Sequence, residues 1–123
     1  MNIPKGHQAV MPYLLVKNAA KLIEFAKNVF NAEQTFRMNG DDENTIRHAE
    51  VNINGSTIML ADATEEWPPH PGGLFVYVDD ADAVYKKALA NNATTIQEPS
   101  DKDYGRSCGV KDAFGNNWWI TSF

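Results

Sequence analysis

The sequence predicts an α+β domain of two βαβββ modules, whose strands form a partly closed mixed sheet around a cleft with the helices outside. Three observations support this prediction. A strand followed by an amphipathic helix occurs twice, a glycine turn precedes the last strand of each half, and the two halves align with each other. With 123 residues the chain is long enough to form a single domain, over residues 1–123, with its own core.

Module one, about residues 9–64, opens with a strand. Met11–Val16 (MPYLLV) is apolar, and Asn18 is expected to cap the helix that follows, because its short side chain can accept a hydrogen bond from a free backbone N–H. The helix is predicted from apolar residues at helical spacing, which are Ala19, Leu22, Ile23, Ala26, Val29 and Phe30.

A β-hairpin completes this module. Residues 39–44 (NGDDEN) form a turn, and Ile46–Ile53 then alternates as a strand. Asn54-Gly55 is a strong hairpin signal, so Ser56–Leu60 is expected to return beside it.

Module two, about residues 72–123, follows a connection over residues 65–73 (EEWPPHPGG), which is too rich in proline and glycine for a helix or an inner strand. Leu74–Val78 is predicted as a strand. Asp79 and Asp80 precede a helix, where negative charge suits the helix dipole. The apolar residues of that helix are Ala81, Val84, Ala88 and Leu89.

A loop is predicted after this helix. It is followed by a strand over Ser107–Lys111, a turn at Phe114-Gly115-Asn116 and a final strand over Trp118–Thr121.

The two halves match along their length. Val16 and Val78 lie 62 residues apart, and Gly55 and Gly115 lie 60 apart. Neither predicted helix can bury its apolar stripe alone, so the modules should pack together, with their inner faces lining the cleft.

Composition excludes several classes of function. The net charge of −5, with no basic run, argues against a nucleic-acid partner. No apolar run approaches the length needed to span a membrane, and the first residues lack the pattern of a signal peptide. The single cysteine excludes an internal disulfide and favours a cytoplasmic location.

In this order of elements, the chain resembles the vicinal oxygen chelate superfamily, which includes glyoxalase I, bleomycin-resistance proteins, fosfomycin-resistance enzymes and extradiol dioxygenases. It is most similar to the PhnB-like branch. The resemblance runs from about residue 9 to 123 and is carried by the segments MPYLLVKNAAKLIEFAKNVFNAE, IRHAEVNINGSTIMLAD, LFVYVDDADAVYKKAL and YGRSCGVKDAFGNNWWI. It implies the fold predicted above and, by analogy with the resistance proteins, a homodimer with grooves between subunits.

The resemblance also implies where a metal would bind. Metal-using members supply two ligands per module, from its first and last strands. These positions fall on Met11, Met59, Gly73 and Trp119. None of these side chains suits a divalent metal such as Zn²⁺ or Mn²⁺. We therefore expect no metal and no cofactor.

The adjacent tryptophans near the C-terminus should face opposite ways, because side chains alternate along a strand. Trp118 and Ile120 should pack under the helices, and Trp119 should face the cleft. There Trp119 either fills the interior or contacts a ligand.

The predicted ligand-binding residues follow from the same alternation. They are Tyr13, His48, Glu50, Met59, Phe75, Tyr77, Arg106 and Trp119, with Arg106 near the rim. His48 either hydrogen-bonds a neighbour such as Glu50 or acts as a general base tuned by Glu50. An atypical metal site of His48 and Glu50 with Asp62 or His70 is a further alternative.

Two other features have structural explanations. Cys108 is expected to be a small buried residue, although the nearby Arg106 could make its thiol reactive. Asp79, Asp80 and Asp82 precede a helix and are expected to cap it rather than bind a metal.

We therefore expect a metal-independent protein that binds a small organic molecule in an aromatic cleft. The alternative is an enzyme of lyase, isomerase or dioxygenase type that uses His48 and Glu50 as base or atypical metal ligands. A third alternative is an interaction domain whose cleft is filled by its own side chains.

Overall fold

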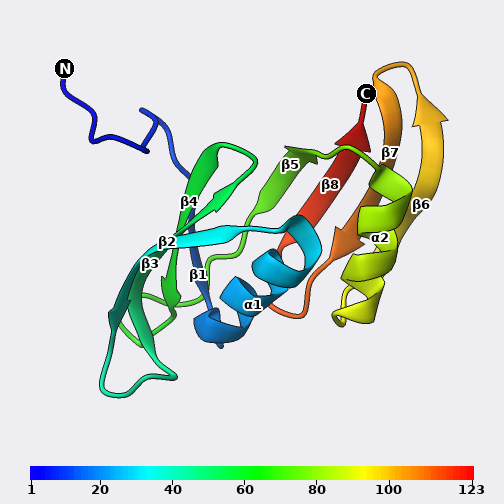
Figure 1. The fold of residues 1–123 in the computed structure, drawn as a ribbon. Helices are drawn as coiled ribbons and strands as arrows, with labels where there is room; N and C mark the ends of the chain where they lie inside the picture. Colours follow the sequence, from blue (N-terminus) through cyan, green and yellow to red (C-terminus); the bar gives the residue numbers. More distant parts are fainter.

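The computed structural model describes residues 1–123 as two modules of equal topology (Figure 1). Module one contains β1 (Tyr13–Val16), α1 (Ala19–Phe30), β2 (Glu33–Asn39), β3 (Ile46–Ile53) and β4 (Ser56–Asp62). Module two contains β5 (Gly73–Tyr77), α2 (Ala81–Ala90), β6 (Thr94–Lys102), β7 (Gly105–Lys111) and β8 (Asn117–Ser122). The predicted α+β fold of two βαβββ modules is confirmed.

Each module forms its own sheet. The strand order is β1-β4-β3-β2 in the first sheet and β5-β8-β7-β6 in the second. In both, the first and last strands of the module are parallel and the other pairs are antiparallel. The two sheets do not close into a barrel (Figure 1). We call the side of each sheet that faces away from the helices its open face.

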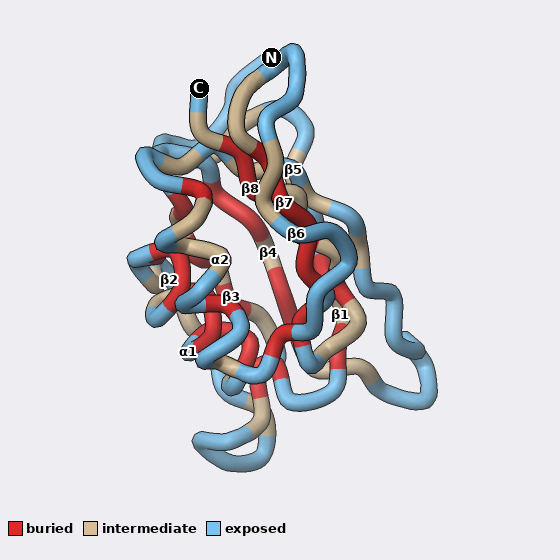
Figure 2. Tube along the Cα trace, turned by 90° about the vertical axis from the view of Figure 1, so that its right-hand side faces the viewer, coloured by how far each residue is buried: buried red, intermediate tan, exposed pale blue.

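The helices join the modules through a common core. Trp118 of β8 is 1% exposed, and its ring centre lies 4.8 Å from that of Phe30 and 6.3 Å from that of Phe25, both on α1. Ile120 is also fully buried, so the predicted positions of Trp118 and Ile120 under the helices are confirmed. Figure 2 shows buried segments along β4 and β8, whereas β6 at the edge is exposed.

The predicted cap at Asn18 is wrong. Asn18 has a left-handed backbone conformation (φ 63°), and its side chain makes no capping hydrogen bond. The carboxylate of Asp62 takes this role instead: its Oδ1 accepts from the N–H of Ala19 at 2.9 Å and its Oδ2 from the N–H of Ile46 at 2.6 Å. The cap of α1 therefore comes from the end of β4.

In module two, α2 is capped both by the residue before it and by the last strand. The side chain of Asp80 accepts from the N–H of Ala83 at 3.1 Å, so the cap expected from its position before α2 is confirmed. In addition, Ser122 Oγ accepts from the N–H of Ala81 at 3.3 Å, at the place on β8 that Asp62 occupies on β4.

The loop predicted before Ser107 is wrong as well, because residues 94–102 form β6. This segment is polar and contains a proline, which is typical of an irregular connection. As an edge strand, however, β6 pairs on one side only, and its ladder with β7 is interrupted between Thr95 and Ser100, around Pro99. Proline is tolerated at such interruptions.

The connection between the modules returns to β1, where His70 forms an isolated antiparallel bridge with Leu15. Neither helix is long and apolar enough to cross a membrane.

Candidate functional site

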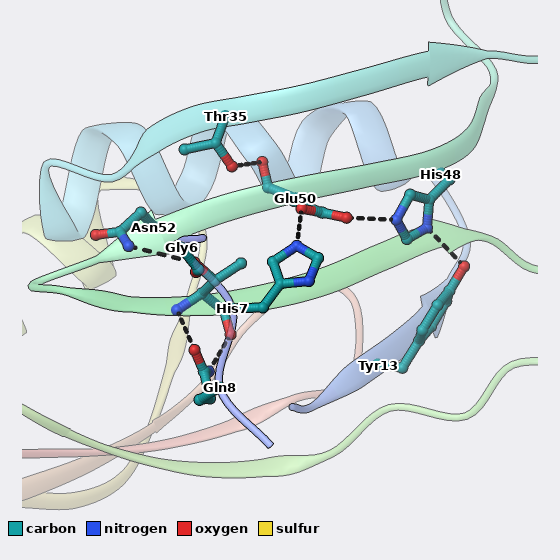
Figure 3. Close-up of polar contacts among 9 residues, drawn as sticks. Gly6, His7, Gln8, Tyr13, Thr35, His48, Glu50 and Asn52 are labelled. Carbon is teal, nitrogen blue, oxygen red and sulfur yellow. Dashed lines mark hydrogen bonds and ion pairs between the residues drawn. The ribbon is translucent and has the colours of Figure 1, made fainter. Parts of the chain in front are cut away.

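The open face of the first sheet carries the polar part of the candidate site. Leu14, Ala49, Val51 and Leu60 point into the core on the α1 side. Because side chains alternate along a strand, Tyr13, His48, Glu50 and Met59 lie on the opposite, open face. Figure 3 shows Tyr13, His48 and Glu50 on the side of the sheet away from α1.

A chain of hydrogen bonds connects these side chains (Figure 3). The Tyr13 hydroxyl lies 2.8 Å from His48 Nδ1, and His48 Nε2 lies 2.9 Å from Glu50 Oε2. The second carboxylate oxygen, Oε1, lies 2.7 Å from His7 Nε2. Two imidazole rings therefore hold the two oxygens of one carboxylate, whose side chain is only 14% exposed.

The environment determines the charge of Glu50 and of Tyr13. The hydrogen bond from His48 is the main cause that lowers the pKa of Glu50; the hydrogen bond from His7 also lowers it, whereas burial opposes both. Burial raises the pKa of Tyr13, and the negative charge of Glu50 raises it further. Glu50 is thus a carboxylate and Tyr13 a neutral phenol near neutral pH.

The N-terminal segment covers part of this face and supplies His7. Thr57 Oγ1 donates to the carbonyl of Gly6 at 2.6 Å, and the amide of Gln8 donates to the carbonyl of Thr57 at 2.6 Å. These bonds place His7 against Glu50 (Figure 3). Sequence reasoning missed His7 because it precedes the repeated unit and belongs to no periodic pattern.

A cavity of about 930 Å³ adjoins the chain at Tyr13. Its floor includes Leu15 and Ala61, and its walls come from the turn before β3 and from the connection after β4. The residues that line it are Tyr13, Leu15, Gly40, Asp41, Thr45, Ile46, Arg47, Ala61, Asp62, Thr64, Glu65, Glu66 and Trp67. This concave space and the hydrogen-bonded chain share Tyr13, which is 45% exposed.

The second sheet has an aromatic open face instead. Phe75 packs against Tyr77 with ring centres 5.2 Å apart and against Tyr104 at 6.3 Å, and all three are at least half exposed. Trp119 of β8 pairs with Gly109 of β7, and its ring lies so close that a Cβ atom on Gly109 would overlap it. The predicted site residues on the open faces therefore form two groups, and the hydrogen bonds and aromatic contacts of their side chains do not join one group to the other.

The prediction that Arg106 lies at the rim of a ligand cleft is wrong. Arg106 shares its strand face with Cys108 and Val110, which are fully buried on the helix side. Its guanidinium bonds both carboxylate oxygens of Asp82 on α2, each at 3.1 Å, and reaches Asp101 at 3.3 Å. Arg106 thus holds α2 to the second sheet.

Cys108 has the structural role that we expected. It is fully buried, and its Sγ lies 3.7 Å from the carbonyl of Ile120. Burial raises the pKa of the thiol to about 11, the charge of Asp82 adds to this and the charge of Arg106 opposes it, so the thiolate needed for reactivity is disfavoured.

The structure does not assemble the alternative metal site. Both oxygens of Asp62 are engaged with backbone N–H groups, and His70 bridges to Leu15 through its backbone. No group of three or more His, Cys, Asp or Glu side chains is placed to hold a metal ion.

Comparison with known proteins gives a consistent result. A family model described as the glyoxalase/bleomycin resistance protein/dioxygenase superfamily matches residues 6–120. An uncharacterised protein of Mycobacterium bovis, Mb0911c, is 34% identical over 122 residues, which cover 89% of this chain and 80% of the relative.

Solved structures share the fold at lower identity. The PhnB protein from Bacillus cereus superposes with a TM-score of 0.75 at 19% identity, over 94% of this chain and 100% of the other. TnmS3, an antibiotic binding protein from Streptomyces sp. CB03234, has a TM-score of 0.71 at 20% identity, over 94% of this chain and 98% of the other.

Proposed function

Because the chain belongs to the glyoxalase/bleomycin resistance protein/dioxygenase superfamily, we propose that it binds a small organic molecule on the open face of its first sheet, without a metal ion. The observation that carries this proposal is the cavity of about 930 Å³ beside Tyr13. Its size is typical of small-molecule sites, and its lining combines the apolar residues Leu15 and Ala61 with several polar and charged side chains. The fold shared with TnmS3, itself an antibiotic binding protein, is compatible with such a role.

Metal independence is supported by the chemistry of the residues at the family's ligand positions. Met11 and Met59 carry thioethers, Gly73 has no side chain, and Trp119 has no free lone pair. Binding would therefore depend on shape, apolar contact and hydrogen bonds.

We also propose that the chain forms a homodimer in the cytoplasm. Phe75, Tyr77 and Tyr104 form an exposed aromatic group on the second sheet, and a second copy that covers it would remove this surface from water. Sedimentation equilibrium of the wild type and of Tyr77→Glu tests this: a dimer that Tyr77→Glu dissociates supports the proposal, and a wild-type monomer at 100 μM, roughly ten times a 10 μM Kd, contradicts it.

The chain has three tryptophans, which offer a direct test of ligand binding. In protein labelled with 5-fluorotryptophan, Trp67 reports on the cavity, Trp119 on the second open face and Trp118 on the core. A library of planar aromatic compounds is screened by ¹⁹F NMR, with resonances assigned from Trp67→Phe and Trp119→Phe. Compounds that shift only the Trp67 signal support the proposed site. Compounds that shift only the Trp119 signal, or no binder at all, contradict it.

An enzyme remains the second candidate, because the Tyr13–His48–Glu50 chain is an arrangement that can move a proton. Each binder is therefore incubated with the protein and followed by proton NMR for chemical change. Turnover that His48→Ala abolishes would identify an enzyme of lyase, isomerase or dioxygenase type. Binders that stay unchanged support a binding protein.

A further inference from the structure

The hydrogen-bonded chain determines which way each proton points. A carboxylate can only accept, so His48 Nε2 must donate its hydrogen to Glu50. In a neutral imidazole the other nitrogen is then an acceptor, and His48 Nδ1 receives the hydrogen of the Tyr13 hydroxyl. The lowered pKa of Glu50 keeps its carboxylate an acceptor, and the raised pKa of Tyr13 keeps the hydrogen on its hydroxyl.

His7 strengthens this polarity from outside the module. Its ring engages Glu50 Oε1 at 2.7 Å, which leaves Oε2 for His48. The N-terminal segment is itself fixed by the bonds between Thr57 and residues Gly6 and Gln8. His7 is thus a positioning residue for the carboxylate.

Tyr13 lines the cavity, and the hydrogen of its hydroxyl is already committed to His48. We propose that Tyr13 offers a ligand in this cavity only a hydrogen-bond acceptor, so that the site selects organic molecules with an apolar body and an N–H or O–H donor, above all amines. This rests on the proposed function. Tyr13 would be the specificity-determining residue, and the chain of His48, Glu50 and His7 would set its polarity.

The remaining walls of the cavity favour the same class of ligand. Its charged residues are Asp41, Asp62, Glu65 and Glu66 against a single cation, Arg47. Trp67 is 62% exposed beside them and can stack on a cationic or aromatic group. Leu15 and Ala61 on the floor suit the apolar body.

Matched probes test the hydrogen-bond preference. 2-Naphthalenemethanol and its methyl ether differ in the donor, and 2-naphthylmethylamine and 2-naphthoate differ in charge. Binding at pH 7.5 is followed by the ¹⁹F signal of Trp67. We expect the alcohol to bind about three- to tenfold more tightly than the ether, the range of one net hydrogen bond. The amine should bind at least about tenfold more tightly than the naphthoate.

The variant Tyr13→Phe should make the alcohol and the ether bind equally. Tyr104→Phe, in the turn between β6 and β7, is the matched control and should leave their ratio unchanged. Equal binding of alcohol and ether to the wild type, or a ratio that survives Tyr13→Phe, would overturn the proposal. If none of the four compounds binds while other aromatic compounds shift the Trp67 signal, the proposed function stands and this ligand class is wrong. If nothing shifts the Trp67 signal, both fail.

A second measurement needs no ligand. Long-range ¹H–¹⁵N NMR of histidine-labelled protein, assigned with His48→Gln, should show the hydrogen of His48 on Nε2. Replacing His7 by Ala should shift the His48 resonances, whereas Lys5→Ala should not. A hydrogen on Nδ1 would reverse the polarity of Tyr13 and overturn the inference.

Discussion

Replacing Asp62 by Ala should destabilise the fold by about 3 kcal/mol, because one carboxylate satisfies two backbone N–H groups. Those of Ala19 and Ile46 donate to it at 2.9 and 2.6 Å. A hydrogen bond to a charged group contributes about 1.5–3 kcal/mol, and loss of a helix cap alone costs about 0.5–2 kcal/mol. Together these contributions give a loss of about 2–5 kcal/mol. Because Asp62 is partly exposed, water can replace part of its hydrogen bonding in the variant, so we expect a loss near the middle of this range. Asp62→Asn keeps one acceptor oxygen and should lose about half as much.

Urea denaturation followed by circular dichroism measures these losses. The matched control is Ser122→Ala, since Ser122 has the same place in module two but accepts one longer bond, 3.3 Å, from Ala81. Its loss should be about 0.5 kcal/mol. The measurements are made with EDTA and with Zn²⁺, because a metal-binding role of Asp62 predicts a loss that depends on Zn²⁺ and a capping role does not. A loss for Asp62→Ala no larger than for Ser122→Ala would refute this reasoning.

Three further predictions concern single side chains. The pKa of Glu50 in the fold lies below its ordinary 4.5, so Glu50 stabilises the protein above that pH, and this contribution is lost as the pH falls through the folded pKa. His48→Ala should therefore reduce the difference between the free energies of unfolding at pH 7 and pH 4. An unchanged difference would contradict the role of His48 in lowering the pKa of Glu50. Gly109→Ala should displace the Trp119 ring and cost about 1–3 kcal/mol, seen as a shifted Trp119 ¹⁹F signal and a lower urea midpoint. Cys108 should react with a thiol reagent at pH 8 only as fast as the protein unfolds, so fast labelling of the folded protein would show that it is accessible.

Local sequence patterns predict much of the fold. The opposite orientations of Trp118 and Trp119 follow from strand alternation, and the amphipathic helices follow from apolar spacing. By contrast, β6 has a polar sequence that becomes a strand only because β7 lies beside it. The cap of α1 could not be predicted either, since Asp62 is 43 residues from Ala19 in the chain.

The candidate site was predictable in part for the same reason. Alternation along β3 predicts that His48 and Glu50 are neighbours on one face, and the two side chains are hydrogen-bonded there. The bond to His7 spans 43 residues and depends on how the N-terminal segment crosses the sheet. The cavity beside Tyr13 depends on a proline-rich connection whose path no periodicity encodes.

The registers of the two sheets explain why only the first carries a polar site. On the first sheet, Tyr13 pairs with Met59, which pairs with Glu50. On the second sheet, the equivalent row is Phe75, Trp119 and Gly109.

The place of the Glu50 carboxylate is thus taken in module two by a glycine, over which the ring of Trp119 lies. A polar chain cannot form there, and the exposed aromatic surface that results suits contact with another protein surface better than recognition of a polar ligand. The two open faces have therefore diverged on one scaffold. If the proposed ligand binds beside Tyr13 and the proposed subunit contact forms beside Phe75, Tyr13→Phe should alter ligand preference without altering the sedimentation of the protein.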